Sequence, residues 1–114
     1  MKIEALEKAK LIVHLAQEEK CEDSVVLGMK NVADFCDFFV ILSGDSHRQV
    51  KALADALQEE LFKKKIKVYK RQDDRESSWV VLDFFDVVVH IFYRELREFY
   101  SLERLWADAE RINF

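Results

Sequence analysis

The amino-acid sequence predicts an α/β (α+β) fold, a mixed five-stranded sheet packed with helices. The chain has 114 residues, which suits a single domain covering residues 1–114. It is 50% hydrophobic and 35% charged, a balance typical of a globular protein. Segments of helical periodicity alternate with short β-branched runs. There is no proline and there are only two glycines, so nothing indicates a linker or a repeat.

The first half of the chain predicts a helix, two strands and a second helix. The first segment is expected to be helical because apolar residues recur at helical spacing, at Leu6, Ala9, Val13 and Ala16. A short strand is expected over 24–27, followed by an irregular stretch over 28–36. The apolar run 38–42 predicts a central strand that is buried on both faces. Ser46 and Gln49 form a capping-box pattern, so the second helix should begin there.

The second half predicts three strands and a closing helix. Weak alternation over 66–70 indicates a third strand, and the polar stretch 71–78 is expected to be a loop. Strands over 79–83 and 86–92 should form a hairpin with Phe84 and Phe85 as an exposed apolar tip. The closing amphipathic helix is expected at Leu102, Leu105, Trp106 and Ala109, with Ser101 as its cap.

Charge and residue types exclude several classes of function. The net charge of −4 disfavours binding that relies mainly on nucleic-acid phosphates and suits a basic partner. Cys21 and Cys36 lack metal or disulfide spacing and are expected to be reduced thiols. His14, His47 and His90 share no ligand spacing, so no metal or other cofactor is expected. The N-terminal stretch carries acids and no apolar run of membrane-spanning length appears, which predicts a cytoplasmic protein.

The turn Gly44-Asp45-Ser46 raises an enzymatic alternative. A strand, a glycine-serine turn and a helix could hold a phosphate, or could belong to a metal-dependent nucleotidyltransferase. That chemistry needs paired carboxylates after the turn. Asp73 and Asp74 instead fall in the charged loop, and Asp83 and Asp86 flank the hairpin turn. A simple capped turn therefore fits better, and no catalytic residue is expected.

The segment KKKIKVYKR (63–71) has six cations and no acid, in an otherwise acidic chain. Its first four cations are Lys63, Lys64, Lys65 and Lys67. It admits two interpretations of equal weight. It contacts RNA phosphates at the periphery of an interface, or it is a solvated helix end followed by a strand edge that lysine protects from aggregation.

Two stretches carry a resemblance to a known family. The first contains the Asp-aromatic-Phe-Val-Ile strand, the Gly-x-Ser turn and the Arg-Gln-Val helix start, at residues 37–41, 44–46 and 48–50. The second runs from Trp79 through Trp106 and includes Asp83, Asp86, His90, Phe92, Arg97, Tyr100, Leu102, Glu103, Arg104 and Leu105. With these residues the chain resembles the ribosomal silencing factor (Iojap-like) family. Three features depart from the pattern: Gly28 replaces an Asp, Phe85 replaces a turn Gly, and residues 76–78 replace a Gly before the Trp.

The resemblance implies a fold like that of nucleotidyltransferases without their catalytic apparatus. It also implies binding to the large ribosomal subunit through its protein L-fourteen, which blocks the small subunit and represses translation when nutrients are limited. If the 63–71 segment contacts RNA, ribosomal RNA is the partner that the resemblance implies. Apart from the resemblance, the lysine-rich edge and the Phe84-Phe85 tip leave a homodimer open, which would not exclude this function. The residues expected to form or shape the partner-binding face are Trp79, Asp83, His90, Arg97, Tyr100 and Glu103.

Overall fold

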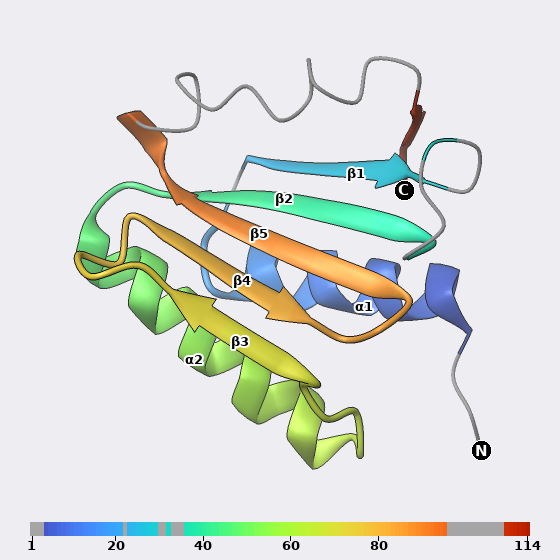
Figure 1. Cartoon of the computed structure of the whole chain (residues 1–114), viewed down its shortest axis with the longest axis horizontal. Helices are drawn as coiled ribbons and strands as arrows, with labels where there is room; N and C mark the ends of the chain where they lie inside the picture. Colours follow the sequence, from blue (N-terminus) through green and yellow to red (C-terminus); the bar gives the residue numbers. More distant parts are fainter. Residues whose placement is uncertain (1–3, 22, 30–31, 33–35, 96–108) are drawn as a thin grey trace.

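The computed structural model describes residues 4–21, 23–29, 32, 36–95 and 109–114. Within these ranges the chain forms helices α1 (Ala5–Glu18) and α2 (His47–Lys63) and six strands of one sheet. The strands are β1 (Ser24–Gly28), β2 (Phe38–Gly44), β3 (Lys70–Asp73), β4 (Trp79–Asp83), β5 (Val87–Tyr93) and β6 (Glu110–Ile112). Their order is β3-β4-β5-β2-β1-β6 (Figure 1). Strands β2 and β5 are parallel and the other neighbours antiparallel, which confirms the predicted mixed α+β fold.

Both described helices lie on the same face of the sheet (Figure 1). Strand residues alternate between faces, so every second residue of β2, β4 and β5 points toward the helices. On this face Val40, Leu82 and Val89 are completely buried, and so are Ile12 of α1 and Leu57 of α2. The main hydrophobic core therefore lies between the sheet and the two helices.

The predicted start of α2 is confirmed. The backbone amide of Gln49 donates to the hydroxyl of Ser46, at 3.0 Å. The Gln49 side chain accepts from the amide of Asp45, one residue earlier than in an ideal capping box. A Cβ on Gly44 would lie 2.8 Å from a methyl group of Val50. Glycine at this position therefore lets the end of β2 approach the first turn of the helix.

The predicted sheet differs from the observed sheet at both of its edges. The third strand covers 70–73 instead of 66–70, because pairing with β4 decides its position and the apolar Ile66 and Val68 pack on the core outside any strand. The predicted loop over 71–78 therefore begins with strand residues. Strand β6 was not predicted, and it adds a sixth strand where five were expected. Most of the predicted closing helix lies outside the described residues, and Ala109, its last expected position, directly precedes β6.

The expectation that Phe84 and Phe85 both form an exposed tip of the β4–β5 turn is wrong for Phe84. Phe84 is 1% exposed and belongs to the core under the helices, whereas Phe85 is 63% exposed. Phe85 has a φ of 74°, in the left-handed region. The amide of Phe84 donates to the carbonyl of Val87 at 2.9 Å, which draws Phe84 inward. Only half of the expected tip is therefore exposed.

Neither described helix is long and apolar enough to cross a membrane.

Candidate functional site

The face of the sheet opposite α1 and α2 carries the sequence-predicted residues of β4 and β5. Trp79 pairs with Phe92, Val81 with His90, and Asp83 with Val88 across the antiparallel ladder. Directly opposed residues project to the same face. Trp79, Asp83 and His90 are thus brought together on one surface by strand register alone.

Aromatic rings from three strands pack against one another on this face. The indole of Trp79 stacks on Phe92 with ring centroids 5.3 Å apart and an interplanar angle of 18°. The imidazole of His90 lies 6.3 Å from Phe92 at 8°, and 4.7 Å from Phe39 of β2 at 55°. Offset and tilted arrangements at these distances are favourable for aromatic pairs. The result is a layer of packed rings in which Phe39, His90 and Phe92 are buried and Trp79 is partly exposed.

His90 is held as a neutral acceptor for Trp79. The indole nitrogen of Trp79 donates to Nδ1 of His90 at 3.3 Å. An indole can only donate, so the proton of the neutral imidazole is on Nε2. That nitrogen is buried and has no hydrogen-bond partner among the described residues. Burial also lowers the pKa of His90 from 6.5 to about 4, because the charged form would lose its hydration.

The β3–β4 turn fixes the start of β4 and therefore Trp79. One carboxylate oxygen of Asp74 accepts from the amides of Ser78 and Trp79. The turn also places Ser77 at a φ of 56°. The hydroxyl of Ser78, which is 4% exposed, lies 3.2 Å from Nδ1 of His47. This turn is built on hydrogen bonds from backbone amides to the Asp74 side chain.

Carboxylates gather at the other end of the face. Burial, and next the charges of Asp37, Asp83 and Asp86, raises the pKa of the Cys36 thiol to about 12. The thiol is therefore unreactive at neutral pH. Asp83 itself accepts a hydrogen bond from the amide of Phe85 at 2.8 Å. The face thus runs from an aromatic end at Trp79 to an acidic end near Asp83.

The remaining predicted residues are placed as follows. Arg97, Tyr100 and Glu103 lie outside the described residues. Lys63 ends α2, and Lys64, Lys65 and Lys67 follow it; all four are exposed. Phe39 and Phe92 were not singled out from the sequence as members of the site. The signal for Phe92 is its position two residues after His90, which puts both on one face of the same strand.

The Gly44-Asp45-Ser46 turn is occupied by structural contacts and not by the groups that the enzymatic alternative requires. The Ser46 hydroxyl caps α2, and the Asp45 carboxylate pairs with Arg94 at 2.8 Å. Within the described ranges, no three His, Cys, Asp or Glu side chains are grouped so that they could hold a metal ion. Both cysteines are buried free thiols, as the prediction of reduced cysteines requires.

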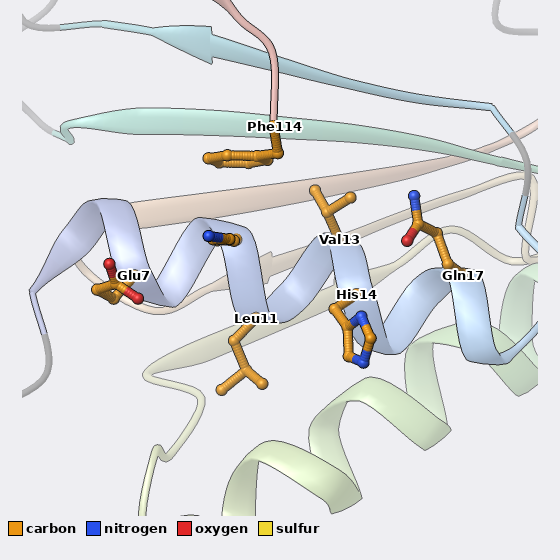
Figure 2. Close-up of a pocket in the computed structure, with 7 residues that line it drawn as sticks. Glu7, Leu11, Val13, His14, Gln17 and Phe114 are labelled. Carbon is orange, nitrogen blue, oxygen red and sulfur yellow. The ribbon is translucent and has the colours of Figure 1, made fainter.

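A shallow groove lies apart from this face, between α1 and the C-terminal Phe114 (Figure 2). Its volume is about 570 Å³. The ring of Phe114 lies across from α1, above Val13, and is 54% exposed. The lining mixes apolar Leu11 with charged Glu7 and Lys10.

The site is a layer of packed aromatic rings with carboxylates at one end, on a small mixed α+β fold. Comparison with known proteins assigns the chain to a family. The family model "Ribosomal silencing factor during starvation" matches residues 2–114, and the chain belongs to this family. It is therefore grouped with ribosome-associated regulators of translation.

Individual relatives agree with this assignment. The ribosomal silencing factor RsfS of Halalkalibacterium halodurans is 36% identical over 93% of this chain and 91% of its own length. The RsfS of Bacillus subtilis is 35% identical over 88% of this chain and 85% of its own. A crystal structure from Chromobacterium violaceum superposes with a TM-score of 0.88 at 29% identity, covering 98% of this chain and 92% of that one.

Proposed function

We propose that this protein binds the large ribosomal subunit through its protein L-fourteen and sterically prevents the small subunit from joining, which represses translation when nutrients are limited. The observation that carries the proposal is the family match over residues 2–114. The mechanism requires no bond to be made or broken, so the protein acts as a binding factor and not as an enzyme. It would act in the cytoplasm, where ribosomes assemble.

The aromatic face would supply the contact area. Trp79 is partly exposed and stacked on Phe92, so it can bury further ring area against a partner with little loss of side-chain freedom. Asp83 would meet cations of a basic ribosomal protein. His90 would fix the orientation of the indole through the hydrogen bond to its Nδ1. From the sequence, Tyr100 would bury aromatic area against the partner, Glu103 would meet partner cations, and Arg97 would shape the surface.

The physical basis of the block is mutual exclusion. A protein–protein interface of ordinary size covers about 800 Å² on each partner. A bound factor of this size on the face where the subunits meet leaves no room for the small subunit. The net charge of −4 would speed encounter with a basic partner. Subunit joining should therefore fall with rising factor concentration, as simple competition by mass action predicts.

Sucrose-gradient sedimentation of purified subunits with added protein tests the proposal. The protein should comigrate with the large subunit alone, and intact ribosomes should disappear as its concentration rises. The proposal fails if the protein stays at the top of the gradient while subunit association is unchanged.

Point variants test the face. Trp79→Ala should weaken binding to isolated L-fourteen by about 30-fold, the loss expected for an aromatic anchor worth about 2 kcal/mol. Trp79→Phe keeps the stacking but removes the hydrogen bond to His90, and its affinity should fall between those of Trp79→Ala and the unchanged protein. Phe114→Ala, which removes an exposed ring elsewhere, is the control. Equal binding by Trp79→Ala and the control would remove Trp79 as the anchor.

A further inference from the structure

An exposed aromatic pair lies at the end of the sheet where β4 turns into β5. Tyr69, just before β3, is 64% exposed, and Phe85 in the turn is 63% exposed. Their ring centroids are 4.2 Å apart with an interplanar angle of 32°. Two large rings held together in solvent form a contiguous apolar patch, which on a soluble protein commonly marks an interaction site.

Asp83 holds this pair in place. Its carbonyl accepts from the amide of Tyr69 at 2.7 Å, and its carboxylate accepts from the amide of Phe85 at 2.8 Å. Phe85 has a φ of 74°, which is costly for a bulky residue and which glycine would adopt freely. Strained positions of this kind cluster at functional sites. The turn therefore exposes the ring of Phe85 to solvent, although the left-handed backbone conformation is unfavourable for phenylalanine.

Four exposed lysines lie close to Tyr69 in the sequence. Lys64, Lys65, Lys67 and Lys70 are exposed, and none forms an ion pair with another described residue. They come from the turn after α2 and the start of β3, which lie at the same end of the molecule as the β4–β5 turn (Figure 1). Of the carboxylates in that turn, Asp86 is neutralised by Lys8 at 2.6 Å. The pair therefore lies between exposed lysines before and at the start of β3 and the carboxylate of Asp83 in the turn, in a chain whose net charge is −4.

We propose that Tyr69, Phe85, Lys64, Lys65, Lys67 and Lys70, here called the aromatic–lysine platform, bind an unpaired segment of RNA. An unstacked base would lie on the Tyr69–Phe85 rings, and the lysines would contact the adjacent phosphates. Stacking on exposed aromatic rings within a basic surface is how proteins hold single-stranded nucleic acid. Lysine is depleted in protein–protein interfaces, so the composition favours RNA over a protein partner. The inference does not rest on the proposed function.

Fluorescence anisotropy with a labelled oligouridylate of about 12 nucleotides, within the usual site size, tests the platform at low salt. The unmodified protein should bind with a dissociation constant in the micromolar range. Tyr69→Ala and Phe85→Ala should each weaken binding about tenfold, the loss of one stacked base. Tyr69→Phe should bind nearly as well as the unmodified protein, because the ring remains.

Two further readouts separate stacking from charge. The double change Lys67→Gln and Lys70→Gln should reduce the dependence of log K on log salt by about 0.7 for each phosphate that no longer meets a lysine. Phe114→Ala is the matched control: it removes an exposed ring beside α1, next to the opposite edge of the sheet, and should leave RNA binding unchanged. Circular dichroism melts confirm folding. Cross-linking of 4-thiouridine RNA to the peptide holding Tyr69 in the unmodified protein decides the question where a variant unfolds.

Several results would overturn the inference. Binding that is absent at about 100 µM, the weak end of non-specific affinity, would exclude an RNA site. Equal affinity for a duplex of the same length, with Tyr69→Ala unaffected, would show a merely electrostatic patch. A Tyr69→Ala protein that binds RNA normally but has a reduced affinity for isolated L-fourteen would make this a protein contact. None of these results bears on the gradient experiment, so the two proposals fail separately.

Discussion

The two faces of the sheet differ in what they bury. Toward α1 and α2 the strands present aliphatic side chains such as Val40, Leu82 and Ile91, each completely buried. The opposite face carries Trp79 and His90 among its apolar residues, so polar atoms are interleaved with rings. Buried polar atoms cost free energy unless they are paired, and Nε2 of His90 has no partner among the described residues.

The two faces of the sheet therefore have different roles. The helix-covered face supplies most of the stability through close packing. The opposite face tolerates a polar group among its aromatic rings, and the proposed contact with the ribosome lies there. Changes on the first face should therefore act mainly on the free energy of unfolding. Changes on the second should act on pH dependence and on binding.

Leu57→Ala should give the largest loss of stability. Leu57 of α2 is completely buried in the core under the helices. Its truncation removes apolar packing and leaves a cavity, which should lower the free energy of unfolding by about 4 kcal/mol. Urea denaturation measures the loss. Leu6→Ala, at a position that is 45% exposed, should lose less than about 1 kcal/mol. Similar losses for the two variants would contradict the assignment of the main core.

His90 should make stability depend on pH from the other face. Its pKa in the folded chain is about 4, below its ordinary value of 6.5. The unfolded chain therefore takes up the proton first as the pH falls. The stabilisation is fully present above pH 6.5 and is lost progressively as the pH falls through 4, by about 3 kcal/mol in total.

Guanidinium denaturation across this pH range checks the prediction. His90→Gln keeps an acceptor for Trp79 but cannot titrate, so its stability should fall less steeply between pH 6.5 and 4. His14→Gln removes a histidine from the exposed surface of α1 and serves as the control. Parallel curves for His90→Gln and the unmodified protein would show that His90 is not buried as a neutral ring.

Strong local patterns made most of the fold predictable from the sequence. The apolar run of β2 and the Ser46–Gln49 cap of α2 each point to one structure without reference to distant residues. Strand β3 gives no such signal, because its sequence KRQD has no apolar face. Its position depends on pairing with β4 and on Arg71, which reaches Asp55 of α2 at 2.8 Å. Such tertiary contacts cannot be read from local sequence.

The candidate site was predictable in its residues but not in its arrangement. Trp79, Asp83 and His90 were named from sequence, yet their position on one face follows from the β4–β5 register. That register also places Phe92 on this face. In the sequence Phe92 is one of a run of apolar residues, and that run by itself does not mark it as a member of the site. At the turn, Phe84 and Phe85 are alike in sequence, but the hydrogen bond from Phe84 to Val87 buries one ring and the left-handed backbone exposes the other.

Gly44→Ala should overpack the helix-covered face of the sheet and leave the opposite face unchanged. The added Cβ would lie 2.8 Å from a methyl group and 3.0 Å from the backbone nitrogen of Val50, so α2 must shift. We expect a loss of about 2 kcal/mol in urea denaturation. Gly28→Ala is the matched control, because its Cβ would meet Glu110 at an ordinary 3.5 Å. A Gly44→Ala protein as stable as Gly28→Ala would mean that β2 and α2 are not in close contact.

The smallest effect concerns Lys8, which ties α1 to the turn beside the second face. Its ammonium lies 2.6 Å from Asp86 and 3.3 Å from the carbonyl of Phe84, and the two charged side chains are 12% and 24% exposed. Lys8→Ala leaves Asp86 partly buried without that cation and should cost about 1 kcal/mol in thermal or urea denaturation. Lys51→Ala breaks an exposed pair with Asp55, with side chains 61% and 50% exposed, and should cost no more than about 0.5 kcal/mol. If Lys8→Ala lowers the free energy of unfolding no more than Lys51→Ala does, the contact between α1 and the β4–β5 turn does not stabilise the fold.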